Sequence, residues 1–86
     1  MGVKQGHRLT SKNERRFLKR LGLRIREVRE GKQMRLEDTI SEDGIKNYQH
    51  FLEIEQGKKN LTTITLFKVA KVLGVKPSKL IEGLEL

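Results

Sequence analysis

The segment GIKNYQHFLEIEQG, residues 44–57, is the part of the sequence that best indicates the fold of this chain. Its apolar residues recur mostly at spacings of three and four, which predicts a short helix over about 47–55 with one side against a core. The other side is polar and can form hydrogen bonds with a partner. The apolar residues are Ile45, Tyr48, Phe51, Leu52 and Ile54, and the polar ones are Lys46, Asn47, Gln49, His50 and Glu53.

A basic loop follows this helix. Gly57 can adopt the left-handed conformation that ends a helix, and Lys58, Lys59 and Asn60 come directly after it. Side chains of these types contact DNA phosphates, while polar side chains at the start of a helix can contact base edges in the major groove. A recognition helix followed by a basic loop predicts double-stranded DNA as the partner.

The length and composition exclude several classes of protein. With 86 residues and 35% hydrophobic content, the chain fits one small helical domain. It has no cysteine, so it has no disulfide, no thiol nucleophile and no cysteine-based zinc site, and its two histidines, His7 and His50, are too few for a zinc site built without cysteine. Its carboxylates are dispersed and no glycine-rich phosphate loop is visible. We expect no enzyme activity, no catalytic residue, no cofactor and no metal.

The sequence also bears on location. No apolar run approaches membrane-spanning length, and the start of the chain lacks the apolar core of a signal peptide. We therefore expect a cytoplasmic, nucleoid-associated protein without a membrane partner.

The net charge of +8 is concentrated at the front of the chain. Residues 1–35 hold 12 Lys and Arg against 3 Asp and Glu, a net of +9, while residues 36–86 hold 7 against 8, a net of −1. A basic segment of this kind indicates a polyanionic partner, because each neutralised phosphate releases counterions. A solvated helix face is the alternative for any single charge. A membrane-surface helix is a weaker alternative, because its apolar stripe is needed in the core.

The first third of the chain predicts an arm and a long helix. Residues 1–11 form a flexible basic arm in this interpretation, and residues 12–86 form a single domain. Ser11 and Glu14 fit a capping box, which predicts an amphipathic helix over about 12–30 that Gly31 closes. Gly22 weakens the middle of this helix and is a candidate for a break within it.

Three further helices complete the expected fold. They cover about 35–42, 63–73 and 77–83, with Thr62 and Thr63 capping the second of these, Gly74 ending it and Pro77 beginning the third. We expect Ile64, Phe67, Ala70 and Leu73 to form one apolar face of the 63–73 helix, joined at its edge by Leu66 and Val69. With the recognition helix, this gives five helices with short loops and an all-α bundle.

Four blocks of sequence resemble the lambda-repressor-like, XRE/Cro type of helix-turn-helix domain over about residues 21–82. They are LGLRIREVR (21–29), MRLED (34–38), EIEQGKKN (53–60) and TLFKVAKVLGV (65–75). The resemblance implies a five-helix fold whose second and third helices form the helix-turn-helix, here with an extended basic N-terminal helix. It also implies sequence-specific DNA binding by a transcriptional regulator, expected to be a repressor, that binds a palindromic site as a homodimer.

Two departures from the family pattern affect the candidate site. Thr39 and Ile40 stand where the family usually has Leu-Ala, and a polar residue at this core position predicts a looser second helix. The interval from Gly44 to Gly57 is one residue longer than the common spacing. The base-contacting positions therefore carry over only approximately, and the candidates are Lys46, Asn47, Tyr48, Gln49 and His50, with Glu53 ranked last because it would repel phosphate.

Each candidate on the recognition helix has an alternative role. Gln49 can pair with adenine, and Lys46 can contact guanine or a phosphate. Asn47 can contact adenine or cap its own helix. Tyr48 can stack on a sugar or a thymine methyl group, but its spacing also suits the core. His50 can contact a phosphate or only solvent.

The resemblance implies roles for six further residues. Arg29 and Glu55 match the family's partly buried ion pair between the first and third helices, which is structural. Lys58, Lys59 and Asn60 match its phosphate-contacting loop, and Arg35, at the start of the second helix, is expected to contact the same backbone. A competing function is a protein-interaction module on the same fold, such as an antitoxin or a bridging protein with non-specific nucleic-acid binding. The acidic second half favours this alternative, and the basic loop argues against it.

Overall fold

The computed structural model describes residues 11–86, and these residues form helices and loops without a strand. The elements in order are α1 (Lys12–Gly31), the 3-10 helix η2 (Leu36–Thr39), α2 (Tyr48–Glu55), α3 (Thr63–Leu73) and α4 (Pro77–Ile81). The predicted all-α class is confirmed. The predicted count of five helices is not, because the second helix is a single 3-10 turn. Residues 1–10 of the predicted arm lie outside the described residues.

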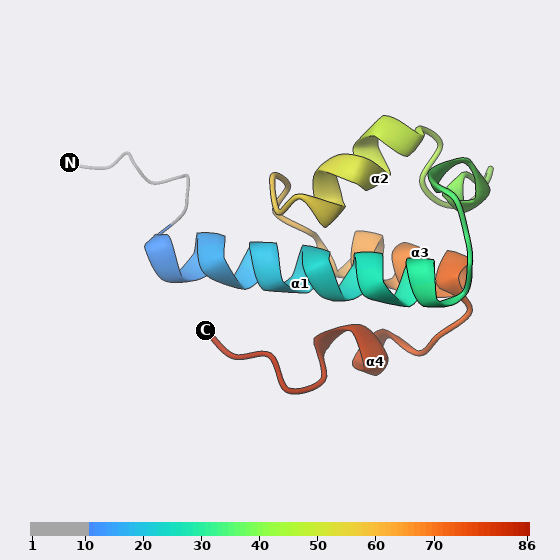
Figure 1. Ribbon diagram of the computed structural model, residues 1–86. Coiled ribbons are helices and arrows are strands. Elements are labelled where there is room, and N and C mark those ends of the chain that lie inside the picture. Colours follow the sequence, from blue (N-terminus) through green and yellow to red (C-terminus); the bar gives the residue numbers. More distant parts are fainter. Residues whose placement is uncertain (1–10) are drawn as a thin grey trace.

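The long helix α1 packs against α2 and α4, and α3 packs against α4 and η2 (Figure 1). In this view α2 lies on one side of α1, α4 lies on the other, and the first turns of α1 project beyond both. The predicted capping box is confirmed: Ser11 Oγ accepts from the backbone N–H of Glu14 at 3.1 Å, and Glu14 Oε1 accepts from the N–H of Ser11 at 3.0 Å. The start of this helix is therefore fixed locally by its own sequence.

Two predictions about glycines in α1 were wrong. Gly31 is the last helical residue and does not turn the chain; Gln33 does so, with a φ of 59°. Gly22 does not break the helix. A Cβ atom there would lie 2.5 Å from the carbonyl oxygen of Ile54 and would also overlap that of Glu55, so the glycine allows α1 and α2 to approach closely.

The predicted 35–42 helix is reduced to η2, and Thr39 explains the difference. The side chain of Thr39 is fully buried, and its Oγ1 donates to the carbonyl oxygen of Leu36 at 2.6 Å. In an α-helix that carbonyl would accept from the backbone N–H of Ile40. Ile40 instead has extended backbone angles and an exposed side chain. The helix that sequence analysis expected to be loose is thus cut to one turn.

The core lies where α1, α2 and α3 meet. Its buried apolar residues are Leu21, Ile25, Ile45, Phe51, Ile54, Val69, Ala70, Leu73 and Leu80. The bounds predicted for α3 are confirmed, with Thr62 as its cap and Gly74 in the left-handed conformation. Its predicted face was wrong in part, because Ile64 and Phe67 are 66% and 55% exposed. The inward face is Leu66, Val69, Ala70 and Leu73, at spacings of three, four and seven.

The close approach at Gly22 gives a prediction for stability. Gly22→Ala should destabilise the fold by about 1–3 kcal/mol, because the new methyl group must displace the backbone of α2. Gly31→Ala is the matched control, since a Cβ atom at Gly31 meets nothing within 4 Å. Urea unfolding followed by far-ultraviolet circular dichroism measures both variants. Equal stability of the two variants would show that α1 and α2 do not approach as described.

Candidate nucleic-acid interface

The amino-terminal edge of α2 is exposed while the rest of the helix is anchored. Phe51, Ile54 and Glu55 are buried, and their burial fixes the inward side of α2. Five residues that the sequence predicted as base-contacting candidates lie together at this exposed edge. They are Lys46, Asn47, Tyr48, Gln49 and His50.

The structure decides between the alternatives for two of these residues. Asn47 caps α2, with Oδ1 accepting from the backbone N–H of Gln49 at 2.7 Å. Its side-chain oxygen is therefore occupied in holding the start of the helix. Tyr48 is 48% exposed, so its assignment to the core was wrong and its ring is accessible to a partner. The side chains of Lys46, Gln49 and His50 are exposed beside it.

The loop after α2 is closed by backbone hydrogen bonds. Gly57 has a φ of 76°, its N–H donates to the carbonyl of Ile54 at 3.1 Å, and the N–H of Lys58 donates to that of Glu53 at 2.9 Å. Lys59 Nζ lies 3.5 Å from Glu53 Oε1. Lys59 and Glu53 thus partly neutralise each other, which leaves Lys58 and Asn60 as the exposed polar side chains of the loop.

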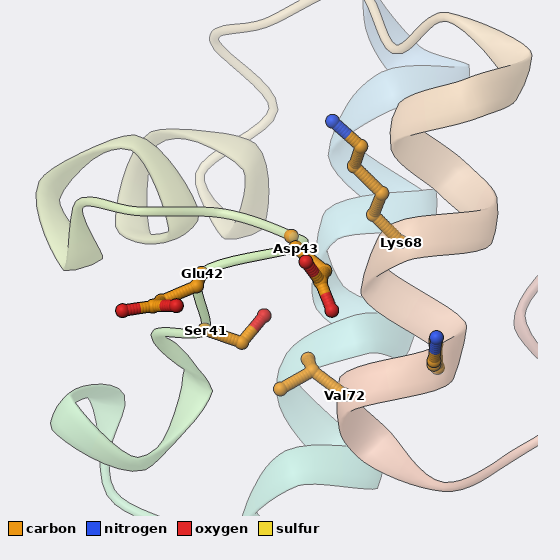
Figure 2. Close-up of a pocket in the computed structure, with 7 residues that line it drawn as sticks. Ser41, Glu42, Asp43, Lys68 and Val72 are labelled. Carbon is orange, nitrogen blue, oxygen red and sulfur yellow. The ribbon is translucent and has the colours of Figure 1, made fainter.

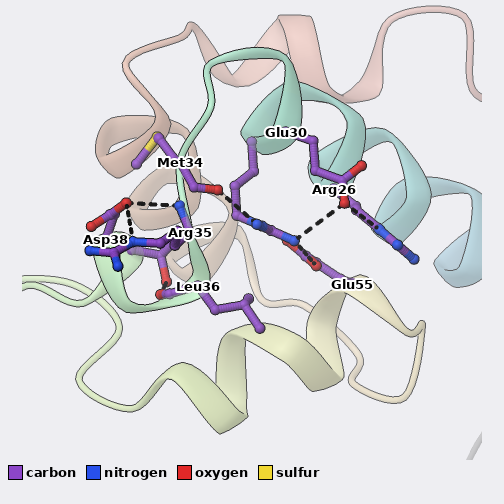
Figure 3. Close-up of polar contacts among 9 residues, drawn as sticks. Arg26, Glu30, Met34, Arg35, Leu36, Asp38 and Glu55 are labelled. Carbon is purple, nitrogen blue, oxygen red and sulfur yellow. Dashed lines mark hydrogen bonds and ion pairs between the residues drawn. The ribbon is translucent and has the colours of Figure 1, made fainter.

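Arg35 lies next to η2, apart from the basic loop. Its backbone N–H donates to Asp38 Oδ2 at 2.8 Å, and its Nε is 3.7 Å from the same oxygen (Figure 3). The guanidinium is exposed and close to a carboxylate that a phosphate would have to displace.

Arg29 and Glu55 form the predicted ion pair between α1 and α2 (Figure 3). Arg29 Nε donates to Glu55 Oε2 at 2.6 Å and Nη2 donates to Oε1 at 3.1 Å, while Nη1 donates to the carbonyl of Met34 at 2.8 Å. The side chains of Arg29 and Glu55 are only 10% and 2% exposed. The hydrogen bond to Glu55 raises the pKa of Arg29, although burial acts in the opposite direction. The guanidinium therefore stays charged.

A shallow pocket separates the turn before α2 from α3 (Figure 2). Its volume is about 260 Å³, and Ser41 and Val72 face each other across it while Glu42 points away. Gly44 lies in this turn, where a Cβ atom would be 2.6 Å from Ser41 Oγ. The pocket combines the acidic turn with Lys68 and Lys71 of α3. It places opposite charges side by side and contains no predicted site residue.

Sequence reasoning missed the part that α1 plays near the loop. Arg15 and Lys19 line the same cleft as Lys58 and Asn60. Sequence analysis predicted only that the basic residues 1–35, which include Arg15 and Lys19, meet a polyanionic partner. These two residues are far from Lys58 and Asn60 along the chain, so no local spacing could reveal their proximity. The one feature of the sequence that could have indicated this contact is the glycine at position 57, where the loop touches α1.

Neither a metal site nor a membrane-spanning helix is found within residues 11–86. No group of three His, Cys, Asp or Glu side chains there could hold a metal ion. None of the helices formed by these residues is both long enough and apolar enough to cross a membrane.

Comparison with known proteins finds a similar fold among solved structures. No family model and no curated protein matches the sequence. Among solved structures, the chain is similar to the restriction-modification controller protein C.AhdI from Aeromonas hydrophila, with a TM-score of 0.67 and 27% identity over 73% of this chain and 94% of that one. This similarity confirms the predicted resemblance to lambda-repressor-like helix-turn-helix domains of the XRE/Cro type. By that resemblance, η2 and α2 correspond to the two helices of the helix-turn-helix motif.

The buried ion pair gives a second stability prediction. Arg29→Met should cost about 3–5 kcal/mol, because it leaves the carboxylate of Glu55 buried without a partner. Arg26→Met, three residues earlier on α1, removes an exposed pair with Glu30 and should cost less than about 1 kcal/mol. The double variant Arg29→Met/Glu55→Leu should recover much of the loss, since no charge is then stranded. Urea unfolding of the three variants checks this, and similar losses for the two single variants would contradict it.

Proposed function

We propose that this protein is a sequence-specific, double-stranded DNA-binding transcriptional regulator of the controller-protein type. The observation that carries the proposal is the exposed polar edge at the start of α2, on a helix whose opposite side is fixed by the core and by the Arg29–Glu55 pair. The similarity to C.AhdI, a restriction-modification controller protein, supports it. Such a protein acts at the nucleoid in the cytoplasm.

In the proposed complex, the start of α2 enters the major groove. Gln49 accepts from and donates to an adenine edge, Tyr48 contacts a thymine methyl group, and Lys46 contacts guanine or a phosphate. Asn47 keeps the helix start in place by its cap. The backbone contacts come from His50, Arg35, Lys58, Lys59 and Asn60. Of the three cations Arg35, Lys58 and Lys59, Lys58 has no carboxylate within ion-pair distance among the described residues.

We also propose that the protein binds a palindromic site as a homodimer and represses transcription. Ile64 and Phe67 lie one turn apart on the outer side of α3 and are more than half exposed. Large apolar side chains that gather on a surface mark protein contacts. A second copy meeting this surface would bury both side chains and present two copies of α2 to successive half-sites.

The specificity proposal predicts the outcome of selection from randomised duplexes at low and near-physiological salt. A short motif should be recovered from the wild-type protein at both, and Gln49→Ala should relax the preference at one base position of that motif, at a cost of about 1–3 kcal/mol in discrimination. Ser78→Ala, at an exposed position on α4, is the control and should keep the motif. Equal loss across all sequences from Gln49→Ala would remove Gln49 from the base contacts. Recovery of no motif would favour a protein-interaction module instead.

The dimer proposal predicts a change in mass. Phe67→Glu should give a monomer at concentrations at which the wild-type protein is a dimer, because the new charge would have to be buried in the interface. Leu23→Glu, at a position 52% exposed on α1, is the control and should stay dimeric. Sedimentation equilibrium measures both variants. A wild-type protein that remains monomeric, alone and on its selected motif, would contradict the proposal.

A further inference from the structure

The first turns of α1 and the α2–α3 loop enclose an open cleft of about 660 Å³. It lies at the end of α2 opposite the proposed base-contacting edge. The loop contributes Gln56, Gly57, Lys58 and Asn60. The helix α1 contributes Arg15, Leu18 and Lys19, which precede its first buried residue, Leu21. The polar side chains that line the cleft are Arg15, Lys19, Gln56, Lys58 and Asn60.

The two walls of the cleft are in direct contact. A Cβ atom at Gly57 would lie 2.7 Å from the Cα and 2.9 Å from the backbone N of Lys19. The loop therefore packs against the backbone of α1 at Lys19, and Gly57 itself has a φ that other residues rarely adopt. Lys19 and Lys58 are thus presented from backbone positions that are fixed relative to each other. A ligand held between them would order few backbone groups on binding.

The lining of the cleft has one sign of charge. It contains three cationic side chains and two amides, and no Asp or Glu residue lines it. Lys59, the other cation of the loop, lies instead near Glu53. Clustered Lys and Arg side chains with amide donors match the oxygens of a phosphate group. An acidic peptide would require a longer surface of the same sign, and the cleft ends at the loop.

The position of the cleft fits the backbone of a DNA duplex. The helix α2 has eight residues and is about 12 Å long at 1.5 Å per residue, and the major groove is about 12 Å wide. When the start of α2 lies in the groove, its far end reaches the phosphates at the groove edge. The cleft opens at that far end, beside Gln56 and Gly57.

We propose that this cleft binds a backbone phosphate next to the bases that α2 contacts, which makes the first turns of α1 a second DNA-contacting element. The proposal rests on the proposed DNA-binding function and assigns a specific phosphate site to Arg15 and Lys19, for which sequence analysis predicted only a share in a basic segment that meets a polyanion. The interaction is independent of sequence. It adds affinity equally to all duplexes and sets the position of α2 along the groove.

The test compares two double variants of the full chain that remove the same charge. Arg15→Gln/Lys19→Gln removes the two cations that α1 contributes to the cleft, and Lys76→Gln/Lys79→Gln removes two exposed lysines at the start of α4 and within it, away from the cleft. Fluorescence anisotropy over a range of salt gives the slope of log K against log salt for a selected and a scrambled duplex. The cleft variant should lower the magnitude of the slope by about one for each phosphate that the protein no longer neutralises, on both duplexes, and the control should stay near wild type.

The outcomes separate this inference from the proposed function. Equal slopes for the two double variants would overturn the cleft as a phosphate site, even if Gln49→Ala still relaxes base preference. A smaller slope for the cleft variant alone, with no preference for the selected duplex in the wild-type protein, would support the cleft and overturn sequence-specific binding. Tighter, Lys19-dependent binding of an RNA duplex of equal length would overturn DNA as its partner. Circular dichroism of both double variants checks that they are folded.

Discussion

The carboxylate of Glu55 is almost completely buried, and the position of α2 depends on how its charge is neutralised. Arg29 holds both carboxylate oxygens and, through its third nitrogen, the carbonyl of Met34. One guanidinium therefore joins α1, α2 and the turn that leads to η2. A buried pair of this kind contributes little net free energy after desolvation, but separating its members is costly. Its effect here is to allow one arrangement of α2 and to penalise others.

This constraint matters because α2 is too short to be stable by itself. Isolated helices of fewer than about 12 residues are marginal in water, so its eight residues depend on tertiary packing. Gly22 lets the backbone of α1 approach the last turn of α2, and Phe51 and Ile54 fill the space beside it. The same packing that stabilises α2 also fixes which of its side chains face outward. The contacts that stabilise α2 therefore also determine that its polar edge is exposed.

The parts of the fold that depend on local interactions were predictable from sequence. The capping box at Ser11, the Thr62 cap and Gly74 each act within a few residues, and the helices they bound were predicted correctly. The failures involve tertiary packing. Thr39 bonds the carbonyl of Leu36 and ends η2 after one turn, and α3 turns Phe67 outward because Val69 fits the core instead. Gly22 was interpreted as a weak point because its neighbour across the interface is not visible in the sequence.

In the candidate site, too, local features were predictable and tertiary ones were not. Residue positions counted from the family spacing are therefore insufficient to assign roles here. Residues 40–47 lie outside the helices, whereas a helix-turn-helix usually joins its helices by a turn of about 3–4 residues. The segment is held by the buried Ile45, whose carbonyl accepts from the N–H of Ser41 at 3.0 Å. The direction of α2 is therefore set by Ile45 at its start and by Glu55 at its end, and not by a rigid preceding helix. For that reason the exposed edge could be predicted from sequence, but the separate roles of Asn47 and Tyr48 could not.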